Sequence, residues 1–70
     1  MRRFLRYSLD HNRPIRGVLM AGGQLLQKTF TVLTMEGDTV TLRLGTKKTL
    51  SLPLRDILSC GYARGDRGET

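Results

Sequence analysis

The chain has 70 residues, of which 12 are lysine or arginine and 6 are aspartate or glutamate, so its formal net charge is +6. This length accommodates one domain with a small core, and 39% hydrophobic residues indicate a globular rather than a disordered protein. No apolar run approaches the roughly 18 residues that would span a membrane. One cysteine, Cys60, and one histidine, His11, exclude an internal disulfide and a four-ligand zinc site. We expect a cytoplasmic protein without a secretion signal, metal or cofactor.

The first 14 residues form a basic lead-in whose conformation the sequence leaves open. Residues 1–16 contain five arginines and a single acid. The apolar residues between Phe4 and Leu9 would form a narrow stripe on a short helix that ends before Pro14. Alternation of Tyr7 and Leu9 would equally suit an extra strand. We favour a short helical or irregular lead-in.

After the lead-in, the apolar residues follow a period of two that is interrupted by turn signals, as in a small antiparallel β-domain. The first strand is predicted over residues 15–21, and Gly22-Gly23 then supplies the positive φ of a tight hairpin turn. A longer strand follows over residues 24–35, with Phe30 on its inward face. A strand of this length in a small domain should bend and serve both halves of a barrel.

The strongest structural signal is a pair of alternating runs on either side of the turn at residues 45–48, because the runs keep the same phase across the turn. Their inward residues are Val40, Leu42 and Leu44 before the turn and Leu50, Leu52 and Leu54 after it. Pro53 indicates that the fourth strand ends, or becomes an edge, near that residue. Residues 54–57 should then make one turn before a last strand over residues 57–62.

These elements predict an all-β fold. Five short strands should close into a small antiparallel barrel of the SH3-like or Sm-like kind, because closure removes long open edges. The barrel would cover residues 15–62, preceded by the lead-in over residues 1–14 and followed by a flexible tail over residues 63–70.

Few side chains suit catalysis. His11 and Cys60 are the only ones whose ordinary pKa lies near neutrality, and a free cysteine in an apolar strand is usually a small buried hydrophobe. We therefore expect no enzymatic activity. Tyr7 and Tyr62 could stack on bases beside arginines, or could pack in part against the core. Arg64-Gly65-Asp66 spells a cell-adhesion tripeptide, which we interpret as coincidence.

The basic charge indicates an anionic partner. Nine of the twelve cations are arginine, whose planar fork suits phosphate. The hairpin over residues 43–48 would hold its cations at the tip of a rigid unit, although lysines there could also simply keep an edge soluble. The candidate nucleic-acid contacts are Arg13, Arg16, Arg43, Lys47, Lys48 and Arg55.

The entry Asn12-Arg13-Pro14-Ile15-Arg16 resembles the start of the ligand-sensing WYL domains of bacterial transcription regulators. The stretch from Leu50 to Ser59, which reads LSLPLRDILS, resembles the segment that closes those domains. The Trp-Tyr-Leu triplet has no counterpart, because the corresponding strand reads Thr39-Val40-Thr41-Leu42. The resemblance covers roughly residues 12–60 and implies an Sm-like barrel that binds nucleic acid. We expect the protein to come from a bacterial or phage cytoplasm.

Three of the candidate cations, Arg13, Arg16 and Arg55, match arginines of that family's pattern. The turn Leu54-Arg55-Asp56-Ile57 is also similar to one in the small Sm-like inhibitor of the Rho termination factor, which implies protein binding.

We therefore expect a non-catalytic domain that contacts RNA or DNA phosphates with weak sequence specificity. The alternative is a protein interaction module that adds strands, or a homo-oligomer that forms a ring through its edge strands without binding nucleic acid. A third interpretation is a sensor domain for a small anionic ligand.

Overall fold

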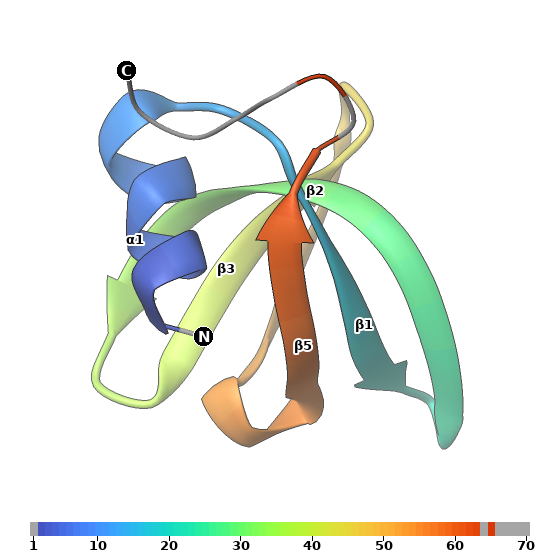
Figure 1. The fold of residues 1–70 in the computed structure, drawn as a ribbon. Helices are drawn as coiled ribbons and strands as arrows, with labels where there is room; N and C mark the ends of the chain where they lie inside the picture. Colours follow the sequence, from blue (N-terminus) through green and yellow to red (C-terminus); the bar gives the residue numbers. More distant parts are fainter. Residues whose placement is uncertain (1, 64, 66–70) are drawn as a thin grey trace.

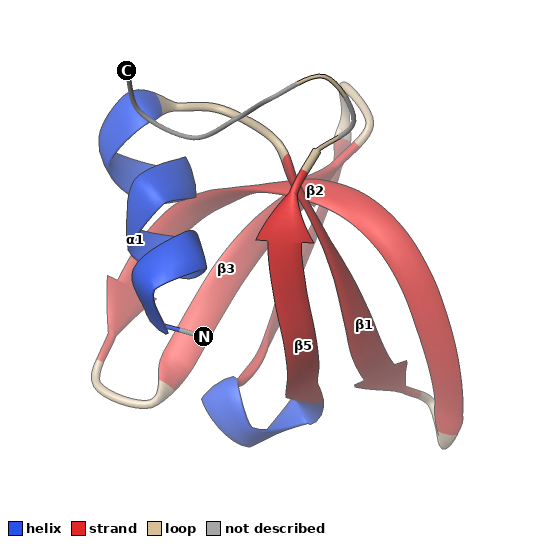
Figure 2. Cartoon of the chain, in the orientation of Figure 1, coloured by secondary structure: helices blue, strands red, loops and turns tan. Residues whose placement is uncertain are grey.

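Residues 2–63 and residue 65 are described by a computed structural model, in which one α-helix packs on a five-stranded antiparallel sheet (Figures 1 and 2). The elements are α1 (Arg2–His11), β1 (Ile15–Ala21), β2 (Gln24–Glu36), β3 (Thr39–Leu44), β4 (Lys48–Pro53), the 3-10 turn η1 (Leu54–Asp56) and β5 (Ile57–Tyr62). The strands lie in the order β4-β3-β2-β1-β5. The five predicted strands are therefore confirmed, with ends close to those expected.

The lead-in is helical, so the interpretation of Tyr7 and Leu9 as part of an extra strand is wrong. Asn12 ends α1 in the left-handed region with φ of +54°, a conformation that asparagine tolerates better than most residues. The backbone N–H of Arg13 then donates to the carbonyl of Ser8 at 3.2 Å. Pro14 follows at once, as the predicted stop signal requires.

The ten residues of α1 make about 15 Å of helix. Among the described residues, no helix has the length and apolar character needed to cross a bilayer. The tail predicted over residues 63–70 lies outside the described residues except for Ala63 and Gly65, and so do Arg64 and Asp66 of the tripeptide.

The long strand β2 bends and pairs with two neighbours, as predicted. Its first half pairs with β1, where Phe30 lies opposite Ile15, and its second half pairs with β3, where Phe30 lies opposite Leu44. The β2–β3 register shifts between Val32 and Thr34, which is a bulge of the kind that bends a strand. Figure 1 shows β2 arching over the sheet between its two partners.

The predicted closure into a barrel is wrong, because the sheet is open. Strands β4 and β5 form its two edges and do not pair with each other. The physical reason lies in α1, which packs against β2, β1 and β5 and covers core that a closed barrel would otherwise have to enclose. At the other end, η1 links β4 to β5, and its Leu54 N–H donates to the Asp38 carbonyl at 2.6 Å.

The core lies between the inner face of the sheet and α1. Its buried apolar residues are Leu5, Tyr7, Ile15, Leu19, Phe30, Val32, Val40, Leu42, Leu52 and Ile57. Leu44, Leu50 and Leu54 are partly buried against this cluster, so the predicted phase of the third and fourth strands is confirmed. Gly17 makes room for Phe30, because a Cβ on Gly17 would lie 2.9 Å from the Phe30 ring and 2.8 Å from the Ser59 carbonyl.

One polar side chain, Ser8, is wholly buried within this core. Its hydroxyl accepts the backbone N–H of Val32 at 2.9 Å and donates to the carbonyl of Arg13 at 2.6 Å. It therefore connects α1 to β2 at the bulge and to the segment that leads into β1. A buried donor or acceptor left without a partner costs about 1–3 kcal/mol, so this serine should carry more stability than its size suggests.

We predict that Ser8→Ala lowers the free energy of unfolding by about 1–3 kcal/mol, because it leaves the Val32 N–H and the Arg13 carbonyl unpaired. The matched control is Ser51→Ala, which removes an exposed hydroxyl bonded to Thr41 at 2.9 Å and should change stability by less than about 0.5 kcal/mol. Urea denaturation of both variants measures the difference. Equal losses would contradict the structural role of Ser8.

Candidate nucleic-acid interface

Strand pairing brings three predicted cations to one level of the sheet. A single row crosses all five strands through Lys48, Leu44, Phe30, Ile15 and Tyr62. Lys48 is part of this row, so it follows the phase of the core-facing residues, but it lies exposed at the start of the edge strand β4. Arg43 precedes Leu44 in β3, and Arg16 follows Ile15 in β1, so both lie one residue from the row. Arg16 and Arg43 are 27 positions apart in sequence, yet they lie at nearly the same level of the sheet because β2 pairs with both β1 and β3 at Phe30.

Arg16 and Arg43 share the outer face of the sheet, which is the face turned away from the core. Arg16 pairs with Thr29 and Arg43 pairs with Thr31, both in β2. The two arginines are therefore separated by two strand spacings, about 10 Å, across the sheet. Lys47 lies in the turn beside Lys48. We refer to Arg16, Arg43, Lys47 and Lys48 as the basic band.

Arg13 belongs to a segment at the same end of the molecule as the basic band. It precedes β1 in the α1–β1 connection, and Figure 1 shows this connection at the same end of the molecule as the β3–β4 turn. The side chains of Arg16, Lys47 and Lys48 are exposed, and that of Arg43 is partly so. The structure thus brings five of the six predicted cations to one end.

Arg55 is the sixth candidate, and the structure does not bring it to the others. It lies in η1, two residues after Pro53. Pro53 of β4 pairs with Thr39 of β3, and Thr39 pairs with Glu36 at the end of β2. Six residues of β2, about 20 Å of strand, separate that level from Phe30.

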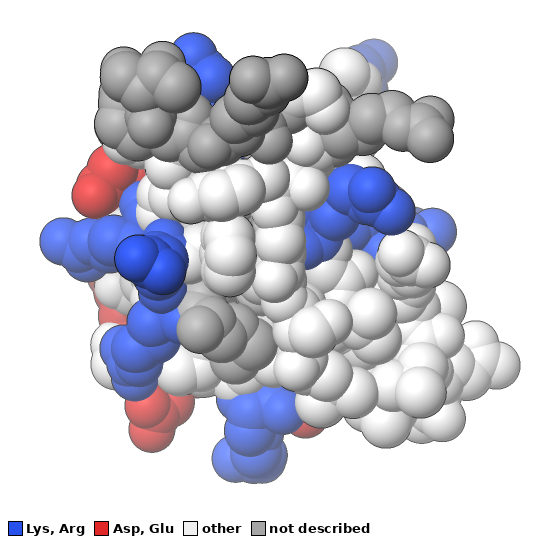
Figure 3. Space-filling model, in the orientation of Figure 1, with Lys and Arg blue, Asp and Glu red and all other residues white. Residues whose placement is uncertain are grey.

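The end that carries Arg55 is the acidic one. Glu36 ends β2, Asp38 lies in the β2–β3 turn and Asp56 is in η1. Asp38 forms an exposed ion pair with Arg2 at 4.0 Å. In Figure 3 acidic side chains lie along the helix side and the lower margin together with several cations, whereas a group of cations without acidic neighbours in view lies at the right. The basic band and the Arg55 end therefore differ in that acids accompany the cations only at the latter.

The outer face between the cations is rich in hydroxyl groups. Thr29 of β2 and Thr49 of β4 are exposed beside Arg16 and Arg43, whereas Thr31, which pairs with Arg43, is buried. No acidic side chain among the described residues intervenes between the two arginines at this level. Threonine hydroxyls and arginines are groups that proteins commonly use to contact phosphates. The arrangement thus suits a chain of phosphates lying across the sheet.

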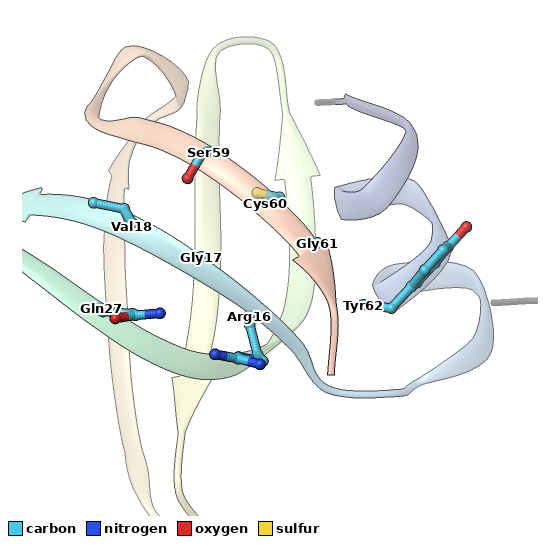
Figure 4. Close-up of a pocket in the computed structure, with 8 residues that line it drawn as sticks. All are labelled: Arg16, Gly17, Val18, Gln27, Ser59, Cys60, Gly61 and Tyr62. Atoms are coloured by element: carbon cyan, nitrogen blue, oxygen red, sulfur yellow. The ribbon is translucent and has the colours of Figure 1, made fainter. Parts of the chain in front are cut away.

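A hollow of about 270 Å³ opens on the same face beside Arg16. Its lining residues are Arg16, Gly17, Val18, Gln27, Ser59, Cys60, Gly61 and Tyr62, from β1, β2 and β5. In Figure 4 the ends of Arg16 and Gln27 point toward one another, and the Ser59 hydroxyl turns toward β1. Gly61 pairs with Arg16, and the space above it is open, since an added Cβ would meet no atom within 4 Å.

Sequence reasoning missed Gln27, Ser59 and Gly61 as parts of a site. The only signal was a glycine inside the last strand, which often marks a close approach or an unfilled position. Its meaning depends on the β1–β5 register, which places Gly61 opposite an arginine.

The aromatic rings pack together at the other side of β5. Tyr62 contacts Phe4 with ring centroids 4.8 Å apart and Tyr7 with centroids 5.2 Å apart, both edge to face. Tyr7 also lies against His11, with ring centroids 4.8 Å apart. Packing, rather than a free stacking platform, is therefore the structural role of both tyrosines.

Cys60 lies on the inner side of β5, opposite Gly17, and is partly buried against the core. Burial raises the pKa of its thiol from 9.0 to about 11. Such a group carries almost no thiolate at pH 7, and thiolate is the nucleophilic form. Among the described residues, no three His, Cys, Asp or Glu side chains gather in a way that could hold a metal.

We predict that Cys60 makes stability fall at alkaline pH. Because its pKa is higher in the folded chain, its contribution is complete below pH 9.0 and is lost as the pH rises toward 11 and beyond. The unfolding free energy of the wild-type protein should therefore decline more steeply between these values than that of Cys60→Ala. Urea denaturation at a series of pH values tests this, and parallel curves would contradict it.

Comparisons of the chain with protein-family models, with curated proteins and with solved structures found no match.

Proposed function

We propose that this protein is a non-catalytic nucleic-acid-binding domain that contacts phosphates through the basic band and Arg13. The observation that carries the proposal is the strand register, which gathers Arg16, Arg43 and Lys48 at one level of the sheet. The acids of the described β2–β3 turn and η1 lie at the far end. A rigid sheet fixes the spacing of the cations, so binding restricts the conformational freedom of little more than the tips of their side chains.

The proposal includes an Sm-like or SH3-like character for the domain and a kinship with WYL domains. Five antiparallel strands around a bent β2 support this view of the fold, and the basic end supports the expected partner. Because few side chains in the band read bases, affinity should come mainly from phosphates and should be salt-dependent. With four phosphate contacts, log K should fall with log salt at a slope of about −3 to −4.

We predict that the double variant Arg43→Glu/Lys48→Glu binds nucleic acid at least about tenfold more weakly, with a salt slope smaller by about 2. The matched control, Arg3→Glu/Arg55→Glu, changes the net charge by the same amount but alters exposed residues of α1 and η1. The control should retain most of the affinity, because these positions lie away from the band.

The measurement is fluorescence anisotropy with labelled single-stranded RNA, single-stranded DNA and duplex DNA at two salt concentrations. Absence of binding at about 50 mM salt would overturn the proposed function. Equal weakening by both double variants would show that net charge acts without a defined surface.

A second candidate function, strand addition leading to homo-oligomers, is supported by the unprotected edge of β5. This strand contains no charged residue and no proline over Ile57–Tyr62, whereas β4 begins with Lys48 and ends with Pro53. Edge strands usually carry such charges or prolines to prevent pairing with another chain. Leu58 in β5 is also 50% exposed. A second copy of this chain is the partner that we propose, because each copy presents the same unprotected β5 edge.

For this candidate we predict that light scattering finds a multiple of the monomer mass and that Leu58→Lys reduces it to the monomer, since a lysine opposes pairing at an edge. The control is Leu25→Lys, because Leu25 is 61% exposed but lies in the internal strand β2. It should keep the wild-type mass. A monomeric wild-type protein with a melting temperature independent of concentration would contradict oligomerisation.

A further inference from the structure

The hollow on the outer face exists because one side chain is missing. Gly61 lies in β5 directly opposite Arg16 of β1. A Cβ added to Gly61 would meet no other atom within 4 Å. The peptide surface of Gly61 therefore forms an exposed floor beside an arginine. The volume of about 270 Å³ is smaller than the roughly 300–1,000 Å³ of sites for drug-sized ligands. It suits a single flat group such as one base.

The polar groups around this floor are those that read base edges. Arg16, Gln27 and Ser59 come from β1, β2 and β5, and the ends of Arg16 and Gln27 point toward one another (Figure 4). Arginine pairs through two bonds with guanine, glutamine pairs with adenine in the same manner, and serine donates or accepts. No acidic residue lines the hollow, and Val18 adds apolar surface on the outer face.

The hollow is continuous with the basic band, because Arg16 belongs to both. A strand whose phosphates lie on Arg43 would pass two strand spacings from Arg16, about 10 Å across the sheet, which is within reach of a neighbouring nucleotide. Lys48 of β4 lies one strand spacing further along the same line. Bases held in a duplex stack cannot enter a small hollow, whereas the bases of a single strand can be turned out.

We propose that this hollow binds one unpaired base of a single strand whose phosphates lie on the basic band, so that the protein distinguishes single strands from duplex. The inference rests on the proposed nucleic-acid binding and adds Gln27, Ser59 and the open position at Gly61 to the site.

The test uses one variant that fills the hollow and one that removes a polar group from it, and both leave the basic band unchanged. Gly61→Val places a side chain in open space on a strand, where a β-branched residue is well accommodated, and Gln27→Leu removes the amide. Ser51→Val is the matched control, because Ser51 lies on the outer face in the edge strand β4, away from the hollow. Urea denaturation of each variant establishes that it is folded.

Anisotropy is measured with a single-stranded RNA, a single-stranded DNA and an abasic strand of equal length, which keeps the phosphates but lacks bases, together with the duplex. Wild type and Ser51→Val should bind the natural single strand about tenfold more tightly than the abasic strand and the duplex. Gly61→Val and Gln27→Leu should bind all of them alike, at the wild-type affinity for the abasic strand. A difference between the RNA and DNA arms would identify the preferred strand.

The base site is overturned if wild type binds abasic and natural strands equally, or if Gly61→Val and Gln27→Leu keep the wild-type preference. Either result leaves the proposed function standing, provided that Arg43→Glu/Lys48→Glu still weakens binding. Failure of the wild-type protein to bind any strand overturns the proposed function itself, and the base site with it.

Discussion

The buried hydroxyl of Ser8 is the contact on which the arrangement of the molecule depends. A single oxygen accepts from Val32 at the β2 bulge and donates to Arg13 at the entry to β1. It thereby holds the end of α1, the bend of the longest strand and the start of β1 in one fixed relation. Among the described residues no buried side-chain polar atom lacks a partner, so the hydrogen bonds of the buried serine offset the cost of removing it from water. The same contact sets α1 over the core, where Tyr7 meets Tyr62.

The bend of β2 then decides which charges become neighbours. Phe30 pairs with Ile15 on one side and Leu44 on the other, so the residues next to those partners, Arg16 and Arg43, reach the same level of the outer face. Gly17 contributes by leaving room for the Phe30 ring at this crossing point. A packing constraint inside the core thus positions two cations outside it. The positions follow from strand pairing, which is why Arg55, equally basic, is left at the acidic end.

Much of the fold follows from alternation and turn residues, whereas the site depends on contacts between distant segments. The phase of Val40, Leu42 and Leu52, the long bent strand and the inward Phe30 are local patterns, and the structure confirms them. Barrel closure was predicted from the need to remove edges, but α1 covers the core, so burying the core does not require closure and the two edges stay open. The burial of Ser8 could not be predicted from a local sequence pattern, because a serine in a helix is ordinarily exposed. The hollow at Gly61 depends on the β1–β5 register, which no local pattern contains.

The two proposed functions use different surfaces of β5. Pairing with another chain occupies backbone groups along the free edge, whereas the hollow lies on the outer face, where Ser59 and Gly61 are too small to fill it. Both can therefore operate in one assembly. Copies that each carry a net charge of +6 repel one another, so strand pairing alone works against electrostatics. A nucleic acid lying on several basic bands would neutralise that repulsion and gain avidity from the repeated contacts, so oligomerisation and binding would strengthen each other.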